Sequence, residues 1–166
     1  MSASRNSLPF TLRTANSGFT LIELMVTIAV MAIIVSIAAP NINEQLAQNQ
    51  IKATSTLIQT SISRAKAESA ISRSRVNWSY SDTDKQITLS SRNATIANYQ
   101  LNDNSLLNFV PNTGTALIIN KEGMINETAG TAANIAINIS DSRASTNTQR
   151  VRINNKRAFE CSGANC

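Results

Sequence analysis

The sequence has no histidine and only two cysteines among its 166 residues. Without histidine, the usual nucleophile–base pairs and the His/Cys metal clusters of normal spacing are excluded. The carboxylates Asp82, Asp84 and Asp103 are isolated in polar stretches, where they are typical of turns. The sequence therefore predicts a protein that is not an enzyme, with no catalytic residues, no metal site and no cofactor.

Aromatic and charged residues are also scarce, at 4% and 15% of the chain. The length allows one domain plus an accessory segment, and any core after the first forty residues must come from scattered Ile, Val and Leu. The formal net charge of +5 is unevenly spread. Between Ser142 and Phe159 there is no acid, and there are five basic residues: Arg143, Arg150, Arg152, Lys156 and Arg157.

One long apolar run is present, from Phe19 to Ala39, with Glu23 as its only charge. Its 21 residues suffice for a helix to cross a hydrocarbon layer about 30 Å thick. The polar, basic residues 1–17 resemble the front of an export signal, but a cleaved secretory signal has a shorter apolar stretch followed by small residues. A buried core helix is the alternative, yet the rest of the chain is too polar to surround one. We expect a retained membrane span.

The next segment, Asn41 to Ser72, favours a continuing helix. Its apolar residues recur at spacings of three, four or seven and predict one stripe that must pack on something: Ala47, Ile51, Ile58, Ile62 and Ala65. Pro40 lacks a backbone donor and crowds the preceding turn, so a kink or local unwinding is expected there.

Short strand-like runs make up the remainder: Val76–Tyr80, Gln86–Ser90, Thr95–Gln100, Thr115–Asn120, Asn134–Ser140, Arg150–Ile153 and Arg157–Cys161. The alternation of isoleucines along 134–140 indicates a sheet with one wet face, which should lie on the helix stripe. Tight turns are expected at Asn120–Met124 and Asn154–Lys156, the second forming a terminal hairpin. The Ser/Thr/Asn-rich stretch Asp141–Gln149 is expected to be a mobile loop.

The run GFTLIELMVTIAVMAIIVSIAAP, residues 18–40, resembles the N-terminus of type IV pilins and of the pseudopilins of type II secretion. In that family a prepilin peptidase of the inner membrane cuts after the Gly and methylates the new N-terminal Phe. A Glu at the fifth mature position pairs with the N-terminal amine of a neighbouring subunit. The resemblance implies cleavage between Gly18 and Phe19, N-methylation of Phe19 and an assembly role for Glu23. On the residues alone, a Glu that reaches interfacial water is the alternative.

More loosely, the segment Leu57–Trp78 and the two expected hairpins resemble the GspH/FimT-type minor pilins. That resemblance implies an α+β fold: a long N-terminal helix, transmembrane in its first half with a kink near Pro40, packed against a small antiparallel β-sheet or β-sandwich head. The implied parts are a leader peptide (1–18), a transmembrane helix (19–40), a periplasmic continuation of the helix (41–74) and the head (75–166).

The implied function is that of a minor pilin that primes or caps type IV pili, supporting twitching motility, adhesion or DNA uptake. A minor pseudopilin of a type II secretion system is the alternative. The implied partners are the prepilin peptidase, other minor and major pilins or pseudopilins, and the inner membrane. The subunit would be single-pass in that membrane with a periplasmic head, and after assembly would lie in the pilus or pseudopilus.

Some members of the group take up DNA, and a Gly-Arg-x-Arg pattern in the last hairpin is implicated there. In this sequence Lys156 stands in place of the Gly, Arg157 matches the first Arg and Phe159 replaces the second, so the pattern is broken. Arg150 and Arg152 lie two apart on the preceding strand and offer a phosphate-binding face by other means. A DNA-binding receptor at a pilus tip, using Arg150, Arg152, Lys156 and Arg157, is thus a hypothesis of another class. The alternative is a solvated face that seats the head against an acidic neighbour.

The two cysteines, Cys161 and Cys166, lie near the end of the sequence. Together with the export-like first segment, they favour one disulfide in an oxidising compartment, with two free thiols as the alternative. Such a bond would hold the end of the last strand against fraying.

Overall fold

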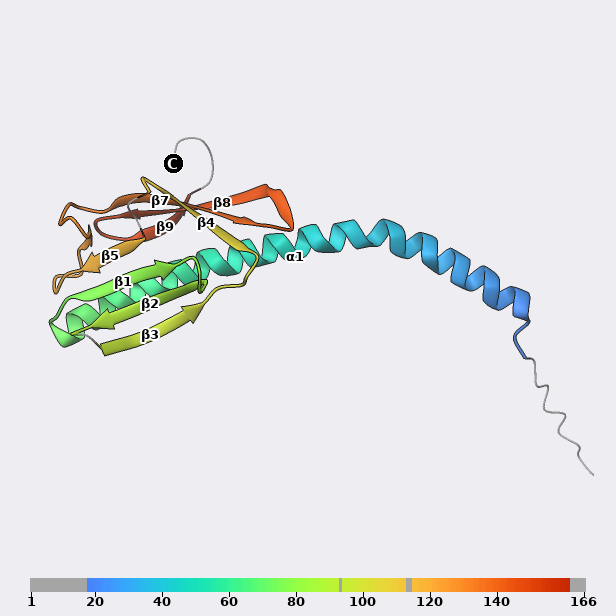
Figure 1. The fold of residues 1–166 in the computed structure, drawn as a ribbon, viewed down its shortest axis with the longest axis horizontal. Coiled ribbons are helices and arrows are strands. Elements are labelled where there is room, and N and C mark those ends of the chain that lie inside the picture. Colours follow the sequence, from blue (N-terminus) through green and yellow to red (C-terminus); the bar gives the residue numbers. More distant parts are fainter. Residues whose placement is uncertain (1–17, 93, 113–114, 162–166) are drawn as a thin grey trace, which may run out of the picture. The chain divides into compact units, whose positions relative to one another are not determined.

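The computed structural model describes residues 18–92, 94–112 and 115–161. The chain divides into two compact units, one up to Ala38 and one from Ala39 onward, and each is considered by itself. Figure 1 shows the elements in order along the chain.

The helix α1 begins at Leu21 and ends at Ser72. Its start is fixed by Thr20, whose hydroxyl oxygen accepts a hydrogen bond from the backbone N–H of Glu23 at 3.2 Å. Thr20 and Glu23 have the spacing of a capping box, and an acid in the first turn also favours the positive end of the helix dipole. The helix assignment continues through Pro40, and the kink expected there stays a prediction.

The second unit combines the later part of α1 with nine strands in the described chain. Their bounds are β1 (Val76–Ser81), β2 (Gln86–Ser91), β3 (Ala94–Gln100), β4 (Ser105–Val110), β5 (Ala116–Ile119), β6 (Ile125–Glu127), β7 (Asn134–Asp141), β8 (Ala144–Asn154) and β9 (Ala158–Cys161). They form two sheets with the orders β3-β2-β1-β5-β6 and β4-β7-β8-β9, and all pairings are antiparallel. The expected α+β class, one long helix with a small antiparallel head, is confirmed (Figure 1).

The core lies between the helix stripe and both sheets. All five apolar stripe residues predicted from the sequence are buried. Four of them join the core cluster with the inward side chains of the strands, and β7 alternates buried and half-buried residues as expected. The largest buried side chain is Trp78 on β1. The head therefore encloses one face of α1.

The same face of α1 also carries buried hydroxyl groups, which bond to the head. The indole N–H of Trp78 donates to Ser61 Oγ at 2.8 Å. Thr54 Oγ1 and Ser105 Oγ lie 3.2 Å apart, and both residues are buried. Because a buried polar group needs a partner, each of these bonds fixes one position of the head on the helix.

Three features of the head differ from the expectation. β4 and β6 were not predicted, and Asp141–Gln149 is not a loop: Asp141 ends β7 and β8 begins at Ala144. The loop prediction was wrong because Asp141 accepts hydrogen bonds from the backbone N–H and the guanidinium of Arg143, which closes a tight turn. After this turn Ala144 pairs with Asp141, and regular pairing with β7 resumes at Thr148.

Candidate functional site

The first unit is a helix whose apolar side chains are uncovered. Residues 18–37 are all exposed, and Phe19 reaches 85%. An 18-residue window of α1 has a mean hydropathy of 2.6 with none of it buried. Because exposed apolar surface of this extent is unfavourable in water, the segment requires lipid or other protein around it.

The few hydroxyls in this segment are satisfied within the helix. Thr27 donates to the carbonyl oxygen of Leu24 at 2.8 Å, and Ser36 donates to that of Ile33 at 2.7 Å. In hydrocarbon every polar group must find a partner inside the protein, and this arrangement provides one. The local chemistry of the helix is therefore compatible with a membrane span.

Glu23 is the only charged side chain between Gly18 and Ile37. Its backbone is engaged by Thr20, but its carboxylate forms no ion pair among residues 18–92, 94–112 and 115–161. A lone carboxylate on an apolar helix is costly in lipid and calls for a cation from outside the chain.

The expected cleavage site lies just before this helix. Gly18 and Phe19 are exposed and precede the first helical residue, Leu21. A Cβ built on Gly18 would meet no atom within 4 Å. The bond between Gly18 and Phe19 is thus in non-helical, uncrowded backbone.

The candidate DNA-binding residues on β8 lie on the outer face of the second sheet. Arg150 donates from Nε to the Asn138 side-chain oxygen at 2.7 Å, and Arg152 donates to that of Asn134 at 3.2 Å. A hollow of about 250 Å³ lies beside both arginines and is also lined by Val110. The two asparagines of β7 thus orient the two guanidinium groups.

The other two candidates lie at the turn between β8 and β9. The guanidinium carbon of Arg157 is 5.0 Å from the centre of the Phe159 ring, a cation–π contact. Phe159 is the register partner of Arg152, so Arg152, Phe159 and Arg157 are brought near one another. Lys156 is exposed in the turn. The structure therefore gathers the four predicted residues into one part of the head.

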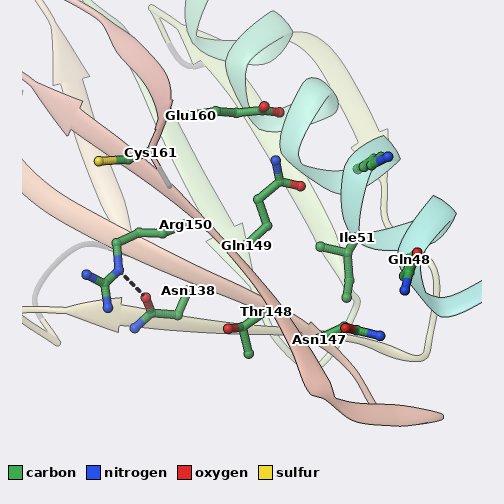
Figure 2. Close-up of a pocket in the computed structure, with 10 residues that line it drawn as sticks. Gln48, Ile51, Asn138, Asn147, Thr148, Gln149, Arg150, Glu160 and Cys161 are labelled. Atoms are coloured by element: carbon green, nitrogen blue, oxygen red, sulfur yellow. Dashed lines mark hydrogen bonds between the residues drawn. The ribbon is translucent and has the colours of Figure 1, made fainter. Parts of the chain in front are cut away.

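A larger hollow, of about 670 Å³, lies between α1 and the end of β9 (Figure 2). Its lining is mostly amide and hydroxyl groups, with Lys52, Arg150 and Glu160 as its charged residues. Glu160 accepts hydrogen bonds from Ser55 at 2.7 Å and from Gln59 at 3.3 Å, which ties β9 to α1. In the part of the chain that the structure describes, the hollow holds no nucleophile–base pair.

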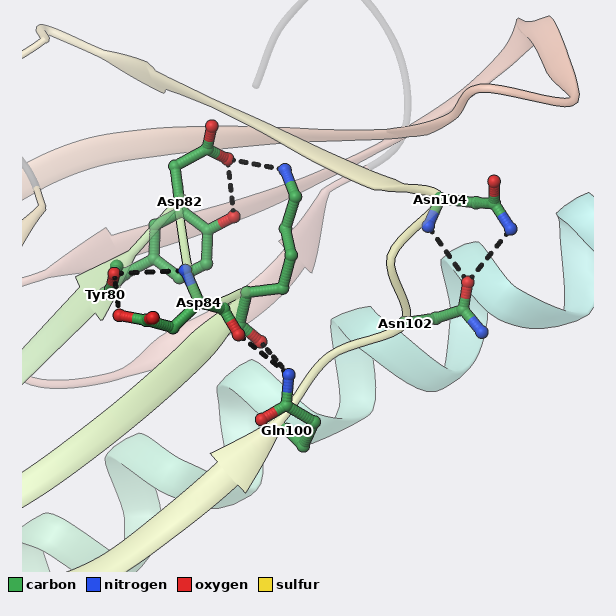
Figure 3. Close-up of polar contacts among 8 residues, drawn as sticks. Tyr80, Asp82, Asp84, Gln100, Asn102 and Asn104 are labelled. Carbon is green, nitrogen blue, oxygen red and sulfur yellow. Dashed lines mark hydrogen bonds and ion pairs between the residues drawn. The ribbon is translucent and has the colours of Figure 1, made fainter.

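The turn between β1 and β2 carries a carboxylate that bonds to two other side chains (Figure 3). Asp82 Oδ1 accepts from Lys85 Nζ at 2.7 Å and from the Tyr80 hydroxyl at 2.9 Å. These two bonds, that from Lys85 first, hold the pKa of Asp82 below its ordinary value. Burial and the bond to Asp82 raise the pKa of Tyr80. Among the described residues no His, Cys, Asp or Glu group is arranged to hold a metal ion, and these contacts shape the turn.

Asp141 is the most deeply buried carboxylate, at 1% exposure. Its two oxygens accept from Nε and Nη2 of Arg143 at 2.9 and 2.8 Å. Arg143 accordingly lowers the pKa of Asp141. This bidentate pair has a structural role, since it closes the turn between β7 and β8.

Sequence reasoning missed several residues that the site uses. Thr20 could have been found, because Thr-x-x-Glu before an apolar run is the signal of a capping box. Asn134 and Asn138 carry no such signal, since only the pairing of β7 with β8 places them beside the arginines. Cys166 lies outside the described residues, so the disulfide expected between Cys161 and Cys166 stays a prediction.

Comparisons with known proteins give one match to the N-terminal segment and one match to the fold. The model of the prokaryotic N-terminal methylation motif matches residues 13–39. Among solved structures, the chain is similar in fold to the minor pseudopilin EpsH from the type 2 secretion system of Vibrio cholerae. The two are 11% identical with a TM-score of 0.50, and the match covers 68% of this chain and 97% of that one. A comparison with curated proteins gives no match.

The methylation motif coincides with the uncovered helix start that holds Phe19 and Glu23. The fold match adds the second half of the arrangement, a long helix packed against antiparallel sheets. The chain therefore carries a prokaryotic N-terminal methylation motif at the start of a fold similar to that of a minor pseudopilin.

Proposed function

We propose that this chain is a minor pilin that primes or caps the assembly of type IV pili. The observation that supports this most is the uncovered apolar helix that begins just after Phe19 and holds one carboxylate, Glu23, which has no ion-pair partner among the described residues. In this proposal the prepilin peptidase removes residues 1–18 and methylates Phe19. The span lies in the inner membrane with the head in the periplasm until the helix enters a filament with other pilins.

Glu23 is the assembly residue in this proposal. Cleavage before Phe19 creates an ammonium group four residues ahead of it, and the same group exists on every neighbouring processed subunit. In a bundle of apolar helices the effective dielectric constant is low, so a carboxylate–ammonium pair between subunits is favourable and an unpaired carboxylate is costly. Formation of this ion pair would stabilise the subunit within the filament.

Replacing Glu23 by alanine is expected to reduce incorporation into filaments by at least about tenfold. Losing one partner of a buried ion pair costs roughly 3 to 5 kcal/mol, and 1.4 kcal/mol already corresponds to tenfold. The measurement is the amount of the subunit in sheared filaments relative to its amount in the membrane. Thr27→Val is the matched control, because the Thr27 hydroxyl bonds only to its own helix.

The two variants should also be compared for leader removal, which is expected to be unchanged in both. If Glu23→Ala enters filaments as well as the parent and complements a deletion, Glu23 is not an assembly residue. An equal loss of filament incorporation in Thr27→Val would also exclude a specific role for Glu23, because it would show that any substitution in the span reduces incorporation.

A minor pseudopilin of a type II secretion system is the alternative machine for the same subunit. The fold match to EpsH, a minor pseudopilin of such a system, favours this alternative. The two machines predict different losses on deletion of the gene: pilus-dependent twitching or adhesion in one case, secretion of exported enzymes in the other. Neighbouring genes for minor pilins or for a secretion operon would discriminate further.

A DNA-binding role at the pilus tip is a second candidate for the head. Its support is the outer face of β8, where Arg150 and Arg152 lie beside a hollow and near the Arg157–Phe159 pair. Basic side chains bind phosphate oxygens without reading the sequence, and one aromatic ring provides little stacking. Weak, salt-sensitive binding of duplex DNA is what this face supports.

Replacing Arg150, Arg152 and Arg157 together by alanine tests that role. Mobility shifts with duplex DNA should weaken by at least about tenfold between 50 and 200 mM salt for the parent, because phosphate contacts release counterions. The triple variant should bind weakly at both salt concentrations. Unchanged binding in the triple variant would rule out this face as the DNA site.

A further inference from the structure

Basic side chains gather at one end of the head, around the C-terminal end of α1. We call this end the basic pole. Its centre is the set Arg73, Arg75 and Arg92, with Lys121 and Lys156 in neighbouring turns. All five side chains are exposed.

Hydrogen bonds bring these segments together. Ser91 Oγ donates to the carbonyl oxygen of Arg75 at 2.8 Å and lies 2.9 Å from Ser74 Oγ. The guanidinium of Arg92 reaches the carbonyl oxygen of Ser72, the last residue of α1, at 3.5 Å. The turn after β2 is therefore held against the end of the helix.

The neighbouring turns are fixed to the same end. Val76 pairs with Ile119, so the turn that holds Lys121 lies near the start of β1. Lys66 on α1 donates to the carbonyl oxygen of Lys156, which places the β8–β9 turn beside the helix. Four separate segments of the chain thus contribute to the basic pole.

The acids near this pole are fewer than its bases. Glu68 lies on the last turns of α1, and Glu122 and Glu127 follow β5. Glu122 is 3.8 Å from Lys121. Arg73, Arg75 and Arg92 form no ion pair among the described residues. The basic pole therefore keeps a surplus of positive charge facing solvent.

The backbone at this pole is also unfavourable for arginine. Arg73 and Arg92 have φ angles of 48° and 49°, in the left-handed region that glycine or asparagine adopts at lower cost. Arg73 directly follows the last helical residue, where glycine is the common choice. Such strain is typical of positions kept for a reason other than stability.

Aspartates gather at the opposite end of the head, which we call the acidic pole. Its exposed members are Asp82, Asp84 and Asp103. Their two turns are joined because Leu101 N–H donates to the carbonyl oxygen of Lys85 at 2.8 Å and Gln100 donates to that of Asp84 at 2.8 Å (Figure 3). Two basic side chains lie near this pole, and each is paired with an aspartate: Lys85 with Asp82, and Arg143 with Asp141. Arg143 lies there because its neighbour Ser142 donates to the Asn104 side chain at 2.9 Å.

The two poles lie at opposite ends of the stretch of α1 that the head encloses. β1 starts at the end of α1 and runs back along it, from Val76 beside the basic pole to the turn at Asp82. Ser105, which follows the acidic pole, bonds to Thr54, whereas Arg73 follows Ser72. The head therefore has a charge polarity along the helix.

We propose that the basic pole docks on the acidic pole of a second copy of this chain, stacking the heads head to tail. Copies whose helices run in the same direction present unlike poles to one another. Complementary charge then fixes the orientation and speeds association. The contact is heterologous, so it propagates along an axis. The inference rests on the proposed assembly of parallel subunits and adds the partner surface of the head.

Charge reversal at each pole tests the contact. One variant carries Arg73→Glu, Arg75→Glu and Arg92→Glu, and the other carries Asp84→Lys and Asp103→Lys. The full chain in non-ionic detergent at low salt is followed by sedimentation and by chemical cross-linking. Each variant alone should lose association at least about tenfold, and an equimolar mixture should regain it, because the mixture again offers unlike poles.

Arg64→Glu is the control, since it reverses an exposed charge on α1 between the two poles. It should associate like the parent. Arg73→Gly should raise Tm by removing backbone strain while it weakens association, which a structural role for Arg73 does not predict.

Failure of the mixture to regain association, or an equal loss in the control, would overturn the proposal. Binding of duplex DNA at the basic pole with no self-association would also overturn it. The sedimentation and cross-linking measurements do not involve Glu23, whose replacement is tested through filament entry. Failure of the pole contact can therefore be distinguished from failure of the proposed function.

Discussion

Replacing Gly18 by valine is expected to leave residues 1–18 attached to the chain and to abolish filament entry. A Cβ at position 18 would meet nothing within 4 Å, and the residue precedes the helix. The substitution therefore leaves the fold unchanged. Its effect must come from a peptidase that has to accommodate the side chain next to the bond it cuts.

The readout is the intact mass of the chain recovered from membranes. The parent should have lost residues 1–18 and gained a methyl group on Phe19, and Gly18→Val should have done neither. Gly18→Ala, the smallest change, should be cleaved at an intermediate rate. Loss of residues 1–18 from Gly18→Val at the rate of the parent would show that the peptidase does not require Gly18. A mature parent whose mass does not equal residues 19–166 plus a methyl group would overturn the assignment of Phe19 as the mature N-terminus.

Replacing Trp78 by alanine is expected to give the largest loss of head stability, about 3 to 5 kcal/mol. Trp78 is fully buried at the centre of the core, between α1 and the inward faces of the strands. Alanine leaves a cavity and removes the donor to Ser61 Oγ. Ser61 itself keeps its bond to the carbonyl oxygen of Ile58 at 2.7 Å, so the hydroxyl is not stranded.

Thermal and denaturant unfolding of the full chain in detergent, followed by circular dichroism, measures this loss. Circular dichroism is required because Trp78 is the single tryptophan. Ser61→Ala is the control that removes the acceptor but keeps the ring, and it should cost about 1 to 3 kcal/mol. Equal losses in both variants would mean that the hydrogen bond, rather than the packing of the ring, dominates at this position.

The helix and most of the sheet were predictable because their residues repeat with clear periods. The stripe from Ala47 to Ala65 recurs at three, four or seven residues, and all of it is buried. β7 alternates isoleucine with polar residues and was found within one residue of its observed end. The motif at Gly18, Phe19 and Glu23 was readable through its resemblance to the N-terminus of type IV pilins, and the methylation-motif model matches the same segment, residues 13–39.

The remaining features depend on contacts that one segment cannot encode. β6 has only three residues and is defined by its pairing with β5. The stretch after Asp141 is rich in Ser, Thr and Asn and has a weak intrinsic preference for strands, so its pairing with β7 decides its structure. The basic pole joins four segments that are far apart in sequence, and no local pattern indicates that Arg92 lies beside Arg73.

The buried hydroxyls on α1 have a consequence for a subunit under tension. If a filament is pulled, helix and head are sheared along the helix axis, and an all-aliphatic seam would allow slippage by one turn, about 5.4 Å, with little change in contact area. The bonds at Thr54, Ser55 and Ser61 are directional. Those at Thr54 and Ser55 lie at one level of the seam, and that at Ser61 lies about 10 Å along the helix from them. A one-turn slip would break all three hydrogen bonds together and leave buried polar atoms without partners. These bonds therefore resist sliding of the helix along the head.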